Sequence, residues 1–372
     1  MLKVGITGQT GFIGTHLYNT LGLYKDKFER IPFEDSYFES KDILNQFVIK
    51  CDVIVHLAAM NRHNDPDVIY NTNIQLVKQL ILACTETSSK PHILFSSSTQ
   101  EERDNLYGKS KKEGRQLLEE WAEKNNTKFT GFIIPNVFGP FGHPYYNSVV
   151  ATFCHQLTHN DLPKIDIDGE IKLIYVAELV NEILLKISNS MASESVFINH
   201  TSSIKVSELL AKLTEFKNNY FSKGEIPSLN NTFDRNLFNT FLCYIDHKIF
   251  FPFNLKLNTD ERGSFVETIK LNSGGQVSFS TTIPGITRGN HFHTRKAERF
   301  AVIKGKARID LRREGTDEIF SFELDGNNPS FVDMPIWFTH NITNIGKDEL
   351  YTIFWINEHF DANDTDTFFE FV

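Results

Sequence analysis

The chain has 372 residues, of which 40% are apolar and 23% are charged, and its formal net charge is −9. This composition is typical of a globular protein with two or three domains of ordinary size. Nucleic acid is excluded as an expected partner, because phosphate backbones require clustered cations and the sequence holds no Lys/Arg tract. The four cysteines form no CxxC pair, and no apolar run reaches the ~18 residues of a membrane span. We therefore expect a cytoplasmic protein with no membrane partner.

The first half of the sequence alternates short apolar runs with longer amphipathic segments. The short runs are typical of buried parallel strands (3–7, 53–57 and 92–96). The segments between them have helical spacing (14–21, 68–85 and 110–123). Such alternation predicts an α/β domain with a Rossmann-like, doubly wound parallel sheet. The pattern becomes more helical from about residue 148 to 244, and we assign this stretch to the same domain.

The second half changes character after about residue 246. Its β-rich segments are separated by Gly, Pro and Asn/Asp turns (276–282, 299–303, 307–311 and 351–356). This pattern predicts an all-β antiparallel sandwich or barrel. The junction is expected within residues 250–257, which gives one domain over 1–247 and a second over 248–372.

A glycine-rich segment follows the first predicted strand and opens the first helix. Gly8, Gly11 and Gly14 have the spacing GxxGxxG. The first permits a tight turn, the second lets the backbone approach a pyrophosphate, and the third lets helix and strand pack closely. A P-loop is the competing interpretation, but no GK[ST] follows. The segment therefore predicts a dinucleotide site.

The end of the second strand should meet the ribose of that cofactor. Glu34 or Asp35 can accept a hydrogen bond from a 2′-hydroxyl, whereas Arg30 can pair with a 2′-phosphate. Because both kinds of residue are present, the sequence does not decide between NAD and NADP.

A YxxxK pair predicts the reducing site. Tyr107 and Lys111, at i and i+4, share one helix face, although an exposed helix with one packed tyrosine has the same spacing. A phenol with a reference pKa of about 10 is a poor proton donor, and an ammonium within ~6 Å lowers that pKa. A hydroxyl should polarise the same carbonyl, and we assign it to Ser98 at a strand end, with Thr99 as the alternative.

The order of these motifs resembles the extended short-chain dehydrogenase/reductase superfamily. Further matching segments are His56-Leu57-Ala58-Ala59, Asn73 and Pro135-Asn136-Val137-Phe138-Gly139-Pro140. The resemblance implies cofactor contacts from the three glycines, Tyr107 and Lys111, and from Thr10, Phe12, Ile13, Leu57, Ala58, Ala59, Pro135 and Val137. One departure is Ile133, where many relatives carry Arg, so anchoring of cofactor or substrate there must differ.

A second constellation, in the β-rich half, resembles the two cupin motifs. The first motif is matched in every spacing by Gly285, His291, His293, Glu298 and Gly305. Residues 335–344 resemble the second, with Trp337 in the usual Gly position and His340 as a further ligand. The resemblance implies one divalent metal on His291, His293, Glu298 and His340; such a set suits Zn, Fe, Mn or Ni, and we favour Zn. A metal-free cupin is the alternative.

A reductase followed by a cupin resembles the CapF-type family of bifunctional capsular polysaccharide enzymes. Matching segments run over nearly the whole chain (96–98, 104–108, 146–153, 260–265 and 284–291). The family implies a UDP-linked 2-acetamido-2,6-dideoxy-4-ketohexose, a 4-keto-6-deoxy amino sugar, as substrate. The cupin would epimerise carbon 3, and the reductase would reduce the 4-ketone with NADPH to UDP-2-acetamido-2,6-dideoxy-L-talose or its L-rhamno isomer. NAD is the alternative cofactor, and a homodimer is expected.

Two other functions stay open at this point. One is a single-activity 4-ketoreductase whose cupin only stabilises a dimer. The other is a sugar-nucleotide sensor, against which the intact Ser98, Tyr107 and Lys111 argue. Substrate contacts are expected from Arg62, Asn136, Asn147 and Ser148, with a solvated loop as the alternative for Arg62. Arg288 and Lys296 are candidates either for a diphosphate contact or for the surface.

Overall fold

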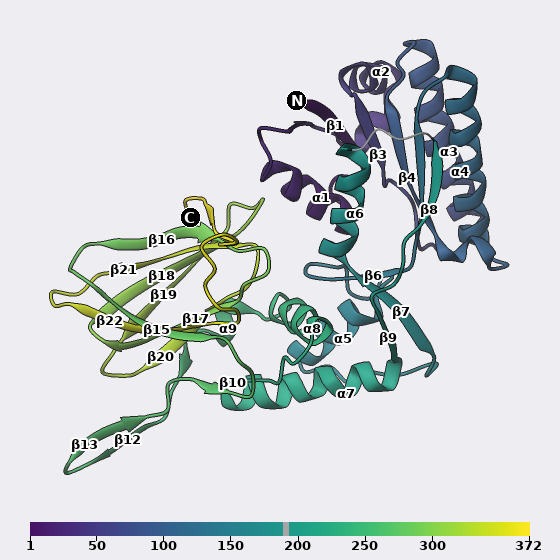
Figure 1. The fold of residues 1–372 in the computed structure, drawn as a ribbon. Helices are drawn as coiled ribbons and strands as arrows, with labels where there is room; N and C mark the ends of the chain where they lie inside the picture. The colour runs from purple at the N-terminus through teal and green to yellow at the C-terminus, as the bar shows by residue number, and fades with distance from the viewer. Residues whose placement is uncertain (189–192) are drawn as a thin grey trace. The chain divides into compact units, whose positions relative to one another are not determined.

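The structure is a computed structural model that describes residues 1–188 and 193–372, and its packing separates two compact units (Figure 1). Unit 1 contains the described residues of 1–149 and 169–205, and unit 2 contains residues 150–168 and 206–372. The helical stretch after residue 205 therefore packs with the β-rich half. The domain boundary expected after residue 247 stays a prediction. Among the helices that the structure describes, none is both long and apolar enough to cross a membrane.

Unit 1 is built on a six-stranded sheet with the order β2-β1-β3-β4-β5-β8, in which every neighbouring pair is parallel. The strands are β1 (Leu2–Thr7), β2 (Phe28–Ile31), β3 (Val53–His56), β4 (His92–Ser98), β5 (Phe129–Ile134) and β8 (Glu194–Phe197). The strand order reverses between β1 and β3, which is where ligands bind in doubly wound sheets. The predicted α/β fold of this half is confirmed.

Helices cover both faces of this sheet (Figure 1). One face packs on α1 (Phe12–Gly22) and α6 (Val176–Ser188), through Leu17 and Leu179 among others. The opposite face packs on α2 (Lys41–Lys50), α3 (Pro66–Glu86) and α4 (Leu106–Asn125). The remaining elements include η1 (Asp35–Glu39), η2 (Thr99–Glu102) and a small sheet of β6 (Asn136–Phe138), β7 (Glu170–Tyr175) and β9 (Ser202–Lys205).

The start of α4 is fixed by local chemistry. Asn105 is its N-cap, and the side chain of Asn105 accepts a hydrogen bond from Gly108 N at 2.7 Å. A Cβ at Gly108 would lie 2.0 Å from the carbonyl oxygen of Gln100, so only glycine lets the helix approach η2 this closely. The first turn of α4, which contains Tyr107, is thereby held against the end of β4.

Unit 2 contains two five-stranded antiparallel sheets, with the orders β11-β20-β17-β22-β15 and β19-β18-β21-β16-β23. Their strands are β11 (Phe253–Asn254), β15 (Gln276–Thr282), β16 (Thr287–Phe292), β17 (Glu298–Lys304), β18 (Lys306–Arg313), β19 (Ile319–Asp325), β20 (Ser330–Met334), β21 (Phe338–Asn344), β22 (Leu350–Ile356) and β23 (Phe368–Phe369). The predicted all-β fold is confirmed. Buried apolar side chains such as Ile309, Phe331 and Trp355 form its core.

Helices and short strands complete unit 2. They are α5 (Val149–Thr158), α7 (Val206–Phe216), a π-helical turn η3 (Lys217–Phe221), α8 (Thr232–Leu242), α9 (His247–Phe250), the pair β10 (Glu225–Ile226) and β14 (Lys270–Leu271), and a hairpin of β12 (Leu257–Asp260) and β13 (Gly263–Val266). A buried ion pair joins Arg299 Nε to Asp333 Oδ1 at 2.7 Å. Asp333 also accepts from the hydroxyl of Tyr220 at 2.5 Å. This network ties the helical segment to the sheets.

Candidate functional site

The glycine-rich loop lies where the order of the parallel sheet reverses. Gly8 has a φ of +71°, and a Cβ there would lie 2.8 Å from the backbone nitrogen of Ala58. A Cβ at Gly14 would lie 2.2 Å from the carbonyl oxygen of Gly8. The loops after β1 and β3 and the start of α1 therefore pack too closely for side chains at these positions.

The N-terminus of α1 is open to an anion. Gly11 is its N-cap, and no side chain of the described residues caps it. The N–H groups of the first helical turn are consequently left to bind a phosphate, and the helix dipole favours negative charge there. Thr10, Phe12 and Ile13 lie in or beside this turn, as the sequence predicts.

The loop after β3 is fastened to the helix that carries Tyr107 and Lys111. Leu57, Ala58 and Ala59 are half-buried in this loop. The side chain of Asn73, on α3, accepts from Met60 N at 2.7 Å and donates to Ser110 Oγ at 3.0 Å. Asn73 thus joins the cofactor loop to α4, a role that its place in a sequence motif does not reveal.

The far end of the cofactor site leaves the 2′-position undecided. The guanidinium of Arg30 packs on the ring of Tyr18 at 4.2 Å and donates to Tyr18 O at 3.2 Å. Glu34 and Asp35 are exposed at the start of η1. The exposed carboxylate of Glu34 or Asp35 can therefore accept a hydrogen bond from a ribose 2′-hydroxyl. The guanidinium of Arg30 already contacts Tyr18 of α1.

Tyr107 and Lys111 lie close together on α4. The Lys111 Nζ is 5.9 Å from the centre of the Tyr107 ring and 5.0 Å from that of Phe95. Burial lowers the pKa of Lys111 to about 8, against the opposing charge of Glu101. Burial, followed by the neighbouring Tyr146, raises the pKa of Tyr107 to about 12. The lowering of the Tyr107 pKa expected from Lys111 is therefore not found, and burial is the main cause of the opposite shift.

The serines that end β4 have different partners. Ser96 Oγ donates to His56 O at 3.3 Å, and Ser97 Oγ donates to the carboxylate of Glu101. Ser98 Oγ instead accepts from Gln100 N at 3.2 Å, so its own proton is available to an outside acceptor. Thr99, the alternative, is exposed in η2. This arrangement favours Ser98 as the hydroxyl that faces a substrate carbonyl.

Of the predicted substrate contacts, Arg62 is bonded to the loop that contains Tyr145 and Tyr146. Arg62 Nη1 donates to the backbone oxygens of Tyr145 and, at 3.3 Å, Tyr146, and Asn61 N donates to the Tyr146 hydroxyl at 3.2 Å. Arg62 therefore holds this loop. Tyr146 enters the sequence analysis only as part of the segment 146–153. Its position as a neighbour of Tyr107 is visible only in the structure.

The other predicted contacts lie at or near the surface of the same unit. Asn147 is exposed and Ser148 is half-buried in the loop that follows Tyr146. Asn136 is exposed and donates to Lys172 O at 3.3 Å. Next to it, Pro135 is buried and Val137 is half-buried, whereas Ile133 is a core residue of β5 that is only 6% exposed. Ile133 thus packs in the sheet and offers no polar group to a ligand.

The four predicted metal ligands converge in unit 2. One ligand atom from each of His291, His293, Glu298 and His340 lies within 4.8 Å of the others. His291 and His340 are register partners on β16 and β21, and Glu298 begins β17. The carboxylate oxygen Oε2 of Glu298 is 3.1 Å from His340 Nε2 and 3.4 Å from His293 Nε2.

The donor set fits a divalent cation. The Nδ1 atoms of His293 and His340 lie at hydrogen-bonding distance from the carbonyl oxygens of Asp366 and Phe338, which turns both Nε2 atoms toward Glu298. The Nε2 atom of His293 is buried and has no hydrogen-bond partner among the described residues. Burial opposes ionisation of Glu298, but the contacts with His293 and His340 hold its pKa far below the usual range. A carboxylate and imidazoles are donors that zinc and other divalent transition metals accept.

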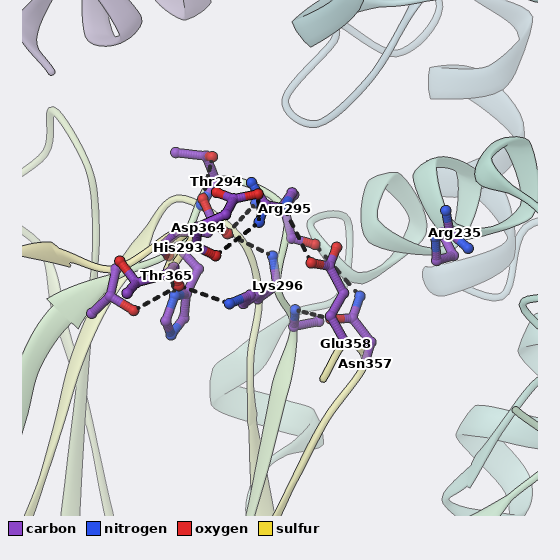
Figure 2. Close-up of polar contacts among 12 residues, drawn as sticks. Arg235, His293, Thr294, Arg295, Lys296, Asn357, Glu358, Asp364 and Thr365 are labelled. Carbon is purple, nitrogen blue, oxygen red and sulfur yellow. Dashed lines mark hydrogen bonds and ion pairs between the residues drawn. The ribbon is translucent and has the colours of Figure 1, made fainter. Parts of the chain in front are cut away.

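The two predicted flanking cations differ in their exposure. Lys296 is only 2% exposed, and its Nζ donates to Thr365 O at 2.7 Å (Figure 2). Arg288 is exposed on β16. Lys296 is therefore buried and bonded to the backbone, so the expectation that it lies at the surface is wrong.

The fold and these two sites define a class of protein: a nicotinamide-dependent reductase of the extended short-chain type joined to a cupin-like β domain. Residues 4–198 match the NAD dependent epimerase/dehydratase family, and residues 258–368 match the polysaccharide biosynthesis C-terminal domain. The chain belongs to the NAD dependent epimerase/dehydratase family and, over its whole length, to the CapF-type enzymes.

Individual relatives support this assignment. A Pseudomonas aeruginosa protein described as UDP-2-acetamido-2,6-beta-L-arabino-hexul-4-ose reductase is 34% identical over 99% of this chain and 98% of its own. The capsular polysaccharide assembling protein CapF from Staphylococcus aureus is 35% identical, with a TM-score of 0.63 over 100% of both chains. An NADPH complex of RMD from Pseudomonas aeruginosa is 20% identical, with a TM-score of 0.54 over 59% of this chain and 83% of its own, which shows the fold alone. The chain is thus an NAD(P)-dependent oxidoreductase with CapF-type architecture.

Proposed function

We propose that this chain is a bifunctional nucleotide-sugar enzyme, in which unit 2 epimerises carbon 3 of a UDP-2-acetamido-2,6-dideoxy-4-ketohexose and unit 1 reduces its 4-ketone. One observation carries the proposal: each chemical set is complete within one unit. Ser98, Tyr107 and Lys111 all belong to unit 1, and the four candidate metal ligands all belong to unit 2. The Pseudomonas relative, described as a reductase of such a UDP-hexulose, supports the choice of substrate.

The reductase chemistry follows from the residues of unit 1. Gly8, Gly11 and Gly14 would hold NADPH, which would supply the hydride for carbon 4. The phenol of Tyr107 gives its proton to the developing alkoxide, and the Ser98 hydroxyl donates a hydrogen bond to the same oxygen. The ammonium of Lys111 stabilises the phenolate that Tyr107 becomes, because the two groups lie close together in a buried site. One hydride and one proton convert the ketone to an alcohol.

The epimerase chemistry follows from the ketone itself. A 4-ketone acidifies the proton on carbon 3, so that a base can remove it and an acid can return it on the opposite face. A divalent cation, which we propose to be zinc, would be held by His291, His293, Glu298 and His340 and would polarise the ketone oxygen as a Lewis acid. The base itself is not assigned.

The proposed product is UDP-2-acetamido-2,6-dideoxy-L-talose or its L-rhamno isomer, a precursor for surface polysaccharide. A labile 4-keto intermediate gives a reason to join both activities in one chain. NADPH is the proposed reductant, and a homodimer is the proposed assembly.

Turnover of the 4-keto nucleotide sugar in deuterated water, with and without NADPH and followed by NMR, tests the proposal. Without NADPH, deuterium should enter carbon 3. With NADPH, the product should be the reduced, epimerised sugar with deuterium at carbon 3. Reduction without deuterium at carbon 3 would leave a single-activity reductase with a structural cupin. Binding without any turnover would favour a sugar-nucleotide sensor.

A further inference from the structure

The carboxylate of Asp366 accepts four hydrogen bonds from the loop that joins two of the candidate metal ligands. This loop contains residues 294–296, between His293 and Glu298. Asp366 Oδ1 accepts hydrogen bonds from Thr294 N at 3.1 Å and from Thr294 Oγ1 at 2.6 Å. Its Oδ2 accepts from Arg295 N at 3.0 Å and from Lys296 N at 3.1 Å. Each oxygen therefore meets two donors, and Asp366 is only 6% exposed.

The backbone of Asp366 acts on the ligand itself. The carbonyl oxygen of Asp366 lies 2.5 Å from His293 Nδ1 and is positioned to accept its proton. That bond fixes the tautomer of His293 and leaves Nε2 with the lone pair that a metal needs. Asp366 has a φ of +45°, a left-handed conformation that Asp and Asn tolerate better than other side chains do.

Lys296 and Arg295 make further contacts in this region, which Figure 2 shows with their labelled partners. Lys296 Nζ donates to Thr365 O, and the guanidinium of Arg295 donates to Glu358 Oε2 at 3.1 Å and to Asp364 Oδ2 at 2.7 Å. Beyond Asp366, β23 pairs with β16 so that Phe369 is the register partner of His291. The segment 358–370 therefore borders the elements that carry the metal ligands.

We infer that Asp366 is a positioning residue of the metal centre, which its carboxylate and carbonyl organise without either being a ligand. The inference rests on the proposed metal site. A site whose ligands are already oriented loses less conformational freedom on binding, so its affinity depends on the groups that orient them. Removal of such an outer partner typically weakens metal binding about 10–100-fold.

The test is Asp366→Asn in the full-length chain. Asn keeps the shape of the side chain and tolerates the left-handed backbone, so the change is confined to one atom. At the Oδ2 position the amide NH2 would face the N–H groups of Arg295 and Lys296. At the Oδ1 position it would face the N–H group of Thr294 and the Thr294 hydroxyl, which can turn to accept, so at least one hydrogen bond is lost either way. The matched control is Asp364→Asn, two residues away, whose side chain is 64% exposed and, among the described residues, accepts from Arg295 alone.

The readouts are zinc affinity, by competition with a chelator, and the visible absorption spectrum of the cobalt-loaded protein. Asp366→Asn should bind zinc about 10–100-fold more weakly and change the cobalt spectrum, which reports ligand geometry rather than fold stability. Asp364→Asn should stay within about two-fold of the parent, as expected for an exposed ion pair. A cooperative thermal unfolding transition of both variants without added metal should show that unit 2, which contains both positions, is folded.

The outcomes distinguish the positioning role of Asp366 from the existence of the metal site. Parental zinc affinity and an unchanged cobalt spectrum for Asp366→Asn would overturn the positioning role and leave the metal site standing. A parent chain that binds neither zinc nor cobalt would overturn the metal site itself. If Asp366→Asn does not fold, Thr294→Val, which removes one donor to Oδ1, replaces it. It should also weaken zinc binding, and parental affinity in that variant would overturn the inference.

Discussion

The ammonium nitrogen of Lys111 lies 5.9 Å from the centre of the Tyr107 ring, one helical turn along α4. Both side chains are largely withdrawn from water, and burial disfavours charge on each of them. Desolvation therefore moves the pKa of Tyr107 up to about 12 and that of Lys111 down to about 8. If Tyr107 is the proton donor, as we propose, the Lys111 charge is the group that would stabilise its phenolate.

Tyr107→Phe removes the proton donor and keeps the ring. NADPH oxidation should fall at least ~100-fold, within the range that a general acid supplies. Carbon 3 exchange should persist, because the metal ligands lie in the other unit. The control is Tyr70→Phe, whose hydroxyl on α3 donates to Glu113 and takes no part in the proposed chemistry. Full NADPH oxidation by Tyr107→Phe would remove Tyr107 from the role of donor.

The loss of reductase activity at alkaline pH, the alkaline limb of its pH profile, should follow the deprotonation of Lys111. The pKa of this lysine is lowered to about 8, so it carries its charge below that pH and loses it above. Because the charge stabilises the developing Tyr107 phenolate, kcat/KM should fall as pH rises through about 8. The measurement is kcat/KM for NADPH-dependent reduction across the neutral and alkaline range.

Glu101→Gln should move this limb to lower pH. The carboxylate of Glu101 favours the charged form of Lys111, so its removal lowers the pKa of Lys111 further. Glu102→Gln, at the exposed neighbouring position in η2, is the matched control and should leave the limb in place. Glu101 also accepts from Ser97 and Arg115, so some loss of rate at every pH is expected. A uniform loss with an unmoved limb would contradict the electrostatic role.

Gly14→Ala should abolish tight dinucleotide binding. The added Cβ would lie 2.2 Å from the carbonyl oxygen of Gly8, so the loop must move away from the place where the phosphates bind. Overpacking of this kind costs about 1–3 kcal/mol, which corresponds to roughly 10–100-fold in affinity if it acts on the bound state. Gly169→Ala is the control, because a Cβ there meets nothing within 4 Å. NADPH fluorescence titration of both variants gives the comparison.

Sequence periodicity and motif spacing predict much of this molecule. Buried strands such as β1 and β4 stand out because parallel strands are apolar along their length, and the glycine and YxxxK motifs are local in sequence. The four candidate metal ligands, which the structure brings within 4.8 Å of one another, are indicated by two family motifs. In each case the signal lies within a short stretch of chain.

The features that sequence reasoning missed depend on distant partners. Asp366 holds a loop about 70 residues away, and Asn73 meets Ser110 on another helix. Neither pairing has a local signature. The pKa of Tyr107 was misjudged for a related reason, since the spacing to Lys111 is visible in the sequence but the burial of both groups is not. Lys296 shows the same limit: a charged residue beside a motif is buried, with a backbone oxygen as partner.

The helical segment before residue 248 should be needed for the β domain to fold. Arg299 and Asp333 are 1% and 4% exposed, and Arg299 Nη1 also donates to Gly224 O at 2.6 Å. The hydroxyl of Tyr220 completes the network by donating to Asp333. A chain that starts at residue 248 lacks Tyr220 and Gly224, and each unsatisfied buried polar group costs about 1–3 kcal/mol.

Two fragments, 206–372 and 248–372, test this requirement by thermal unfolding in the presence of zinc. The longer fragment should unfold cooperatively, and the shorter one should melt at a clearly lower temperature or show no transition. In the full-length chain, Tyr220→Phe keeps the ring stacked on Phe250 and loses only the hydrogen bond to Asp333. It should lower the stability of unit 2 by about 1.5–3 kcal/mol, the usual worth of a hydrogen bond to a charged group. Equal melting temperatures for the two fragments would show that the sheets close without the helical segment, and would support a domain boundary after residue 247.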